Sequence, residues 1–156
     1  MEAATEAMRI EDVHRVTVLG GGTMGQQIGF QCAGHGYDVV IYDIDPAALE
    51  AAEERINVYA AGLETAGMVT SDLRASARAR ITLTSDLGAA AREADLVSEA
   101  VPEDPDLKGR VLAEFNVACP PRTIFMTNTS TLLPSQFATA SGRGDRLLAL
   151  HFHLPV

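Results

Sequence analysis

A cluster of glycines directly after a short β-branched segment constrains the fold of this chain more than any other feature. Arg15–Leu19 has the composition of a strand that is buried on both faces, and Gly20 follows it at once. Residues 23–35 then show a helical pattern of apolar positions. Gly20, Gly22 and Gly25 therefore lie in a tight connection between a strand and a helix, with the spacing G-x-G-x-x-G.

Strand and helix patterns alternate through the rest of the chain. Asp45, Thr70 or Ser71, and Ser85 are suited to cap the helices that follow them. Alternation of this kind predicts an α/β fold, with a Rossmann-like, doubly wound, mostly parallel sheet and helices on both faces, in three layers. We predict further strands at 38–42, 81–83, 95–98, 123–126 and 147–152, and helices at 46–63, 71–79 and 107–118, with a short helix after Ser85.

Length and composition limit the chain to one ordinary globular domain. The 156 residues have room for one core, and 47% are hydrophobic and 21% charged. Residues 1–12 lack a settled apolar period, so we expect a flexible N-terminal arm or a short helix there and a domain over 13–156. Twelve basic against 21 acidic residues give a net charge of -9, which disfavours a nonspecific grip on a phosphate backbone. We expect no nucleic-acid partner.

The cysteines and the absence of long apolar runs indicate the compartment. Cys32 and Cys119 are too few to stabilise a fold by disulfides, and we interpret both as reduced packing residues. No apolar run approaches the roughly 20 residues that span a bilayer, and the N-terminal residues lack the apolar segment of a secretion signal. We expect a cytoplasmic protein with no membrane partner.

An acid at the end of the second predicted strand extends the glycine pattern into a ligand prediction. The glycines permit a tight turn, close approach of a diphosphate and close helix–strand contact, and the helix start adds unpaired N–H groups. Asp43 lies where a carboxylate can accept the hydroxyls of an adenosine ribose. Ile44–Pro46 contains no Arg or Lys to pair a 2′-phosphate, which favours NAD over NADP. We expect no metal ion, and we expect the cofactor to contact Gly20, Gly22, Thr23, Met24, Gly25 and Asp43.

Each of these signals also has an ordinary structural explanation. Glycine-rich turns are common without a ligand, and Asp43 could be a solvated loop acid or a helix cap. The combination of strand, glycine loop, helix and acid is what favours the dinucleotide.

Four stretches, in order, resemble the N-terminal domain of the L-3-hydroxyacyl-CoA dehydrogenases. They are VTVLGGGTMGQQIGFQCAGHGYDVVIYDID at 16–45, DLVSEAVPEDPDLKGRVL at 95–112, TNTSTL at 127–132 and HFHLPV at 151–156. The resemblance runs from about His14 to Val156. The first stretch alone is typical of many dinucleotide enzymes, whereas the four together are specific to this family.

The resemblance implies roles for four further residues. In the family an acid and a lysine of the second stretch lie along the cofactor, which corresponds to Glu103 and Lys108, although a solvated lysine at a helix end is the alternative for Lys108. The serine of the N-T-S motif contacts nicotinamide and substrate, and a later histidine is the catalytic base. These correspond to Ser130 and His151, while Asn128 is expected to brace the turn. A hydroxyl can polarise the reacting oxygen while an imidazole accepts its proton.

The implied reaction is oxidation of an L-3-hydroxyacyl-CoA thioester to the 3-ketoacyl thioester, with hydride transfer to NAD. Arg55 is the only basic residue between Asp43 and Arg74, which weakens the coenzyme A assignment. Free or differently activated 3-hydroxy acids, as used by relatives resembling gulonate or carnitine dehydrogenases, are therefore an alternative. A noncatalytic dinucleotide-binding module is another.

The chain departs from the family pattern in its last stretch and in its length. The family commonly has H-F-F-N-P, whereas this chain has His153 and Leu154, and Leu154 cannot make the contacts of the asparagine. On a strand, His153 would share a face with His151 and either support the site or pack there. Family members continue into a helical C-terminal domain that forms a homodimer, closes the acyl pocket and supplies a glutamate to the histidine. We expect the 156 residues alone to bind cofactor and to turn over little.

Overall fold

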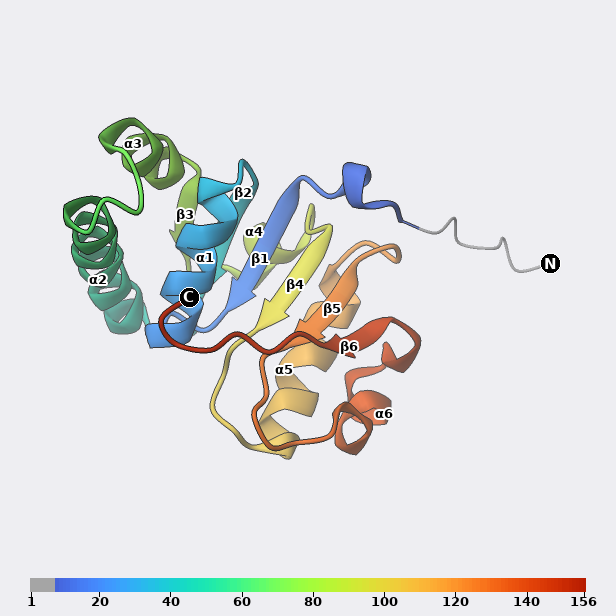
Figure 1. The fold of residues 1–156 in the computed structure, drawn as a ribbon. Coiled ribbons are helices and arrows are strands. Elements are labelled where there is room, and N and C mark those ends of the chain that lie inside the picture. Colours follow the sequence, from blue (N-terminus) through green and yellow to red (C-terminus); the bar gives the residue numbers. More distant parts are fainter. Residues whose placement is uncertain (1–7) are drawn as a thin grey trace.

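The computed structural model describes residues 8–156 and shows six parallel strands in one sheet (Figure 1). The strand order is β3-β2-β1-β4-β5-β6, and every neighbouring pair is parallel. This confirms the predicted α/β, doubly wound fold. The strands are β1 (Arg15–Leu19), β2 (Asp38–Tyr42), β3 (Ile81–Thr84), β4 (Leu96–Glu99), β5 (Ile124–Thr127) and β6 (Leu147–Ala149).

Helices cover both faces of the sheet and divide its core in two. The first core cluster joins β1 and β2 to α1, α2 and α3, and the second joins the opposite face to α4 and α5. Both clusters are made of aliphatic and aromatic side chains with almost no exposed surface. The helices are α1 (Thr23–Gly34), α2 (Pro46–Thr65), α3 (Ser71–Ala79), α4 (Leu87–Ala91), α5 (Pro105–Ala118) and α6 (Ala138–Ser141), with short 3-10 turns at Ile10–Asp12, Pro134–Gln136 and Gly144–Arg146.

The ends of the helices follow the capping pattern with one correction. The side chains of Asp45 and Thr70 accept hydrogen bonds from the first turns of α2 and α3, as predicted. The prediction that Ser85 caps α4 was wrong, because the Asp86 carboxylate accepts from the main-chain N–H of Ala89 at 2.9 Å. Aspartate is an equally good cap, so composition alone did not separate the two neighbouring positions.

Two sequence predictions concern the ends of the chain. Of the arm expected at 1–12, residues 1–7 lie outside the described part, while Ile10–Asp12 form a 3-10 turn with no buried residue. The strand predicted at 147–152 is too long, since β6 ends at Ala149 and pairing with β5 stops at the Leu150 N–H, which donates to Thr127 O at 3.1 Å. Residues 150–156 instead cross the carboxyl ends of the strands toward α1 (Figure 1).

Both cysteines are free, in agreement with the prediction that they are packing residues. Burial raises the pKa of each thiol to about 11, so both stay protonated near neutrality. Over residues 8–156, none of the helices combines the length and apolar character needed to cross a membrane.

Candidate active site

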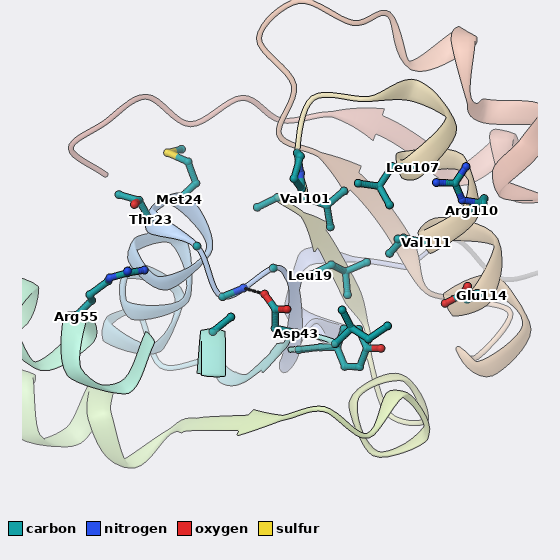
Figure 2. Close-up of a pocket in the computed structure, with 18 residues that line it drawn as sticks. Leu19, Thr23, Met24, Asp43, Arg55, Val101, Leu107, Arg110, Val111 and Glu114 are labelled. Atoms are coloured by element: carbon teal, nitrogen blue, oxygen red, sulfur yellow. Dashed lines mark hydrogen bonds between the residues drawn. The ribbon is translucent and has the colours of Figure 1, made fainter. Parts of the chain in front are cut away.

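A crevice of about 650 Å³ opens at the carboxyl ends of β1 and β4, where the connections of the sheet turn to opposite faces (Figure 2). Such a switch point is the common ligand site of open α/β sheets. Five of the residues predicted to bind the cofactor line it, namely Gly20, Gly22, Thr23, Met24 and Asp43. The structure thus brings the glycine loop and the acid of the second strand to one cavity.

The glycines of the loop differ in what surrounds them. Gly20 has a φ of +107°, and a Cβ built on Gly25 would lie 1.9 Å from the carbonyl oxygen of Gly20. Gly25 is therefore a packing position that lets α1 approach the loop, and it does not line the crevice. By contrast, a Cβ on Gly22 would meet no atom within 4 Å, so the main chain there faces open space. That space fits a diphosphate lying against bare main chain.

The N-terminus of α1 lacks a side-chain cap, unlike the N-termini of α2 to α5. The helices α2 to α5 are capped by Asp45, Thr70, Asp86 and Asp104, whereas the N-cap residue of α1 is Gly22, which has no side chain, and the first turn of α1 contains no acid. Its first N–H groups and the positive end of its dipole thus face the crevice without a protein acceptor among residues 8–156. This arrangement suits an anionic ligand.

Asp43 is oriented by main-chain donors on both of its oxygens. Oδ2 accepts from the N–H of Gly21 at 2.8 Å, and Oδ1 accepts from the N–H of Asp45 at 3.0 Å. Each carboxylate oxygen can accept a second hydrogen bond, so the group remains able to receive ribose hydroxyls. The contact with Gly21 also ties the acid to the glycine loop, and Figure 2 shows the carboxylate beside that loop in the crevice.

Apolar side chains form the walls of the crevice, and two arginines line it as well. Val101, Leu107 and Val111 face Leu19 across the space (Figure 2), an apolar slot of the kind that holds a flat base. Neither Arg55 nor Arg110 was among the predicted site residues. Arg55 lies two helical turns after Ala48 on the same side of α2, and that spacing was a signal that it could face the loop.

Glu103 and Lys108, which the family resemblance places along the cofactor, are not among the residues that line the crevice. Lys108 is fully buried, which excludes the solvated alternative, and its Nζ lies 2.7 and 3.0 Å from the two oxygens of Glu99. The distance from Nζ to Glu103 Oε2 is 3.3 Å. Sequence reasoning missed Glu99, because an acid at the end of a buried strand gives no local signal of its partner.

Glu103 holds the turn that carries Ser130. Its Oε1 accepts from the N–H groups of Ser130 at 3.0 Å and Thr131 at 3.1 Å, and from the hydroxyl of Thr129. Burial acts to raise the pKa of this carboxyl, but the hydrogen bonds from Thr129 and Thr131 and the charge of Lys108 outweigh it and lower the pKa to about 2. Glu103 is therefore a charged anchor for this turn at neutral pH.

Ser130 and His151 meet at the same edge of the sheet. Ser130 Oγ lies 2.9 Å from His151 Nε2, and both residues are exposed. The Asn128 amide oxygen accepts from the Phe152 N–H at 2.6 Å, which braces the turn against the segment after His151, as expected. His151 and His153 were expected to share one face of a strand, but neither lies on one, because β6 ends at Ala149. The centroids of their rings nevertheless lie 4.2 Å apart.

Comparison with known proteins gives a consistent family. The profile described as "3-hydroxyacyl-CoA dehydrogenase, NAD binding domain" matches residues 15–156. The 3-hydroxyadipyl-CoA dehydrogenase of Escherichia coli is 35% identical over 92% of this chain and 30% of its own length. The L-carnitine dehydrogenase of a Pseudomonas species is 31% identical over 94% of this chain and 44% of its own length.

A solved diketoreductase, described as acting on dicarbonyl compounds, is 46% identical with a TM-score of 0.86, over 92% of this chain and 51% of that one. The chain thus spans about half the length of the diketoreductase. It spans less than half the length of the two curated relatives named above. The glycine loop, the uncapped helix, Asp43 and the matched profile agree, and the chain belongs to the 3-hydroxyacyl-CoA dehydrogenase family as its NAD-binding domain.

Proposed function

We propose that this chain forms the cofactor half of an NAD-dependent dehydrogenase that oxidises an L-3-hydroxyacyl thioester to the 3-ketoacyl thioester. The observation that carries the proposal is the 2.9 Å contact between Ser130 Oγ and His151 Nε2 at the sheet edge that also holds the crevice. A hydroxyl and an imidazole in contact form a donor and a base for one substrate oxygen.

In this proposal each side chain has a defined task. The glycine loop and the start of α1 bind the diphosphate, and Asp43 binds the adenosine ribose. Glu103, which pairs with Lys108, supports the turn that carries Ser130. Ser130 donates a hydrogen bond to the oxygen of the substrate carbinol, and His151 Nε2 accepts the proton of that hydroxyl. NAD supplies the hydride acceptor when bound.

Two classes of substrate fit the relatives: coenzyme A thioesters and 3-hydroxy acids without coenzyme A. The relatives that act on CoA thioesters include the 35% identical enzyme of E. coli, whereas the 46% identical diketoreductase is described as acting on dicarbonyl compounds. The match to a carnitine dehydrogenase, whose named substrate is not a coenzyme A thioester, supports a substrate without coenzyme A as the second candidate. An assay that compares acetoacetyl-CoA with free 3-keto acids, each with NADH, decides between them.

The proposal extends to the protein's surroundings. We infer a cytoplasmic homodimer with no nucleic-acid or membrane partner. Turnover then requires residues beyond this span, which covers between 30% and 44% of the curated relatives named above. The exposure of Ser130 and His151 supports this, because a dehydrogenase site excludes water during hydride transfer.

Two measurements test the proposed function. The 156-residue chain is expected to bind NADH, followed by the fluorescence of its nicotinamide, and to turn over little. In the longest natural form of the protein, His151→Gln is expected to lower the rate by about 10²–10⁴-fold while NADH affinity is retained. A noncatalytic dinucleotide-binding module would bind NADH and show no dehydrogenase activity in any form.

A further inference from the structure

The buried ion pair of Glu99 and Lys108 contains one residue, Glu99, that has no task in the chemistry described above. Glu99 ends β4 and Lys108 lies on α5, and neither side chain has any exposed surface. Removing two charges from water costs free energy that their attraction does not always recover. Stability alone is therefore a weak explanation for this pair, and its contacts indicate another.

Every polar atom of the pair has a partner. Besides Lys108, the Glu99 carboxylate accepts from the Thr127 hydroxyl at 2.6 Å and from the Val101 N–H at 2.7 Å. The Lys108 ammonium lies between two carboxylates, Glu99 at 2.7 Å and Glu103 at 3.3 Å, and also contacts Val101 O at 3.3 Å. Glu99 thus fixes the Lys108 ammonium from the interior of the protein. The positive charge of the ammonium also faces the Glu103 carboxylate.

An unbroken series of polar contacts continues from Glu103 to the reacting groups. Glu103 accepts from the Ser130 N–H at 3.0 Å, and Ser130 Oγ lies 2.9 Å from His151 Nε2. The series therefore begins at a carboxylate with no exposed surface and ends at two exposed side chains.

We propose that Glu99 is a positioning residue for Ser130 and His151 and acts through Lys108 and Glu103. The Glu99 carboxylate sets the place of the ammonium, the ammonium holds the Glu103 carboxylate, and that carboxylate holds the turn at the angle where Ser130 Oγ meets His151. The catalytic consequence rests on the proposed function. The positioning itself belongs to the folded chain and can be measured without turnover.

The test compares the double variant Glu99→Gln/Lys108→Met with the single variant Lys108→Met. The double variant leaves no unpaired charge in the interior, so its thermal midpoint is expected to lie above that of the single variant. The ¹⁵N resonance of His151 Nε2 reports the contact with Ser130, and Ser130→Ala gives its position without that contact. We expect the double variant to move this resonance at least halfway to the Ser130→Ala position, even where its stability recovers.

A wild-type His151 resonance in the folded double variant would show that the pair only supports the fold, and would overturn the inference. If the double variant does not fold, Glu103→Gln tests the same series of contacts through the His151 resonance. The Glu103 side chain is 36% exposed, and glutamine keeps an acceptor oxygen but loses the charge that attracts Lys108. The same displacement is expected there, and an unmoved resonance again refutes the inference. Failure of the wild-type chain to bind NADH would instead count against the proposed function, because the resonance does not depend on cofactor.

Discussion

The cofactor crevice and the Ser130–His151 pair lie at the same edge of the sheet but are held in place by different means. The crevice is lined by main chain, apolar side chains, two acids and two arginines, and its parts come from short continuous segments. The reacting pair comes from two loops, and the turn that carries Ser130 is held by the partly exposed Glu103, which contacts the buried Lys108. Local sequence therefore specifies the cofactor site, whereas the orientation of the reacting groups depends on contacts between distant segments.

The largest expected effect lies in the buried cluster. Lys108→Met leaves Glu99 charged and unpaired in the interior, which is expected to reduce the free energy of unfolding by about 3–5 kcal/mol. Urea unfolding followed by circular dichroism measures this loss. Arg80→Met is the matched control, because its pair with Asp38 is about half exposed and its loss is expected to cost less than about 1 kcal/mol. Equal losses would show that burial of the cluster is unimportant.

At the glycine loop beside the crevice, Gly25→Ala should have the greatest effect. The new Cβ would meet the Gly20 carbonyl, a main-chain atom that cannot move aside, so we expect a loss of about 3 kcal/mol in stability and no measurable NADH binding. Gly62→Ala serves as the control, since that position in α2 faces open space and the helix is expected to gain up to about 1 kcal/mol. Thermal unfolding and NADH titration of both variants check the pair. Normal binding by Gly25→Ala would contradict the described loop.

Asp43→Asn sharpens the comparison by changing one charge in the crevice. Asparagine offers a single acceptor oxygen where the carboxylate uses both, so NADH affinity is expected to fall by about 2 kcal/mol, or roughly 30-fold. Asp45→Asn is the control, because asparagine caps a helix as well as aspartate does. Isothermal titration of the two variants measures the difference, and an equal loss in both would remove Asp43 from the proposed ribose contact.

The charge of Glu103 gives the chain a predicted pH dependence. Its pKa falls from an ordinary value of 4.5 to about 2 on folding, so its contribution to stability is complete above the unfolded pKa and is lost as the pH falls from there through about 2. After allowance for solvent around a side chain that is 36% exposed, this amounts to about 1 kcal/mol. Wild type should exceed Glu103→Gln in unfolding free energy at pH 6, and the gap should narrow toward pH 3. A gap that does not change with pH would contradict the depressed pKa.

The smallest effect is expected at Arg55. Its exposed guanidinium lines the crevice, and Figure 2 shows it reaching from α2 to the side where Thr23 lies. Arg55→Gln is therefore expected to weaken NADH binding by about two- to fivefold and to leave adenosine binding unchanged, since adenosine has no phosphate. Arg74→Gln, which lies outside this crevice and pairs with Glu64, should leave both affinities unchanged. Titration at two salt concentrations checks the charge effect, and identical results for the two variants would refute it.

The cofactor crevice could be predicted from the sequence to a greater extent than the contacts behind the Ser130–His151 pair. The parallel, doubly wound sheet and the place of Asp43 were predicted from hydrophobic period, glycine spacing and the topology of parallel sheets, all of which are local or general rules. The interior position of Lys108 could not be predicted, since its buried partner Glu99 lies on another element and no spacing rule connects them. The early end of β6 was missed for a similar reason. The apolar residues after it satisfy a strand pattern, but Phe152 packs on the core and its N–H pairs with the Asn128 side chain instead of a neighbouring strand.

The segment that crosses the strand ends has a mechanical consequence. Its beginning is bound to β5 through the Leu150 N–H. Its far end is bound to α1 and α2, because the Val156 N–H donates to Gln27 and the Val156 carbonyl accepts from Gln31 and Tyr59. A force applied at residue 156 therefore acts on α1 through Gln27 and Gln31, which lie within about two turns of the glycine loop that precedes the helix. Tension at Val156 and occupancy of the cofactor crevice therefore act on the same helix, α1.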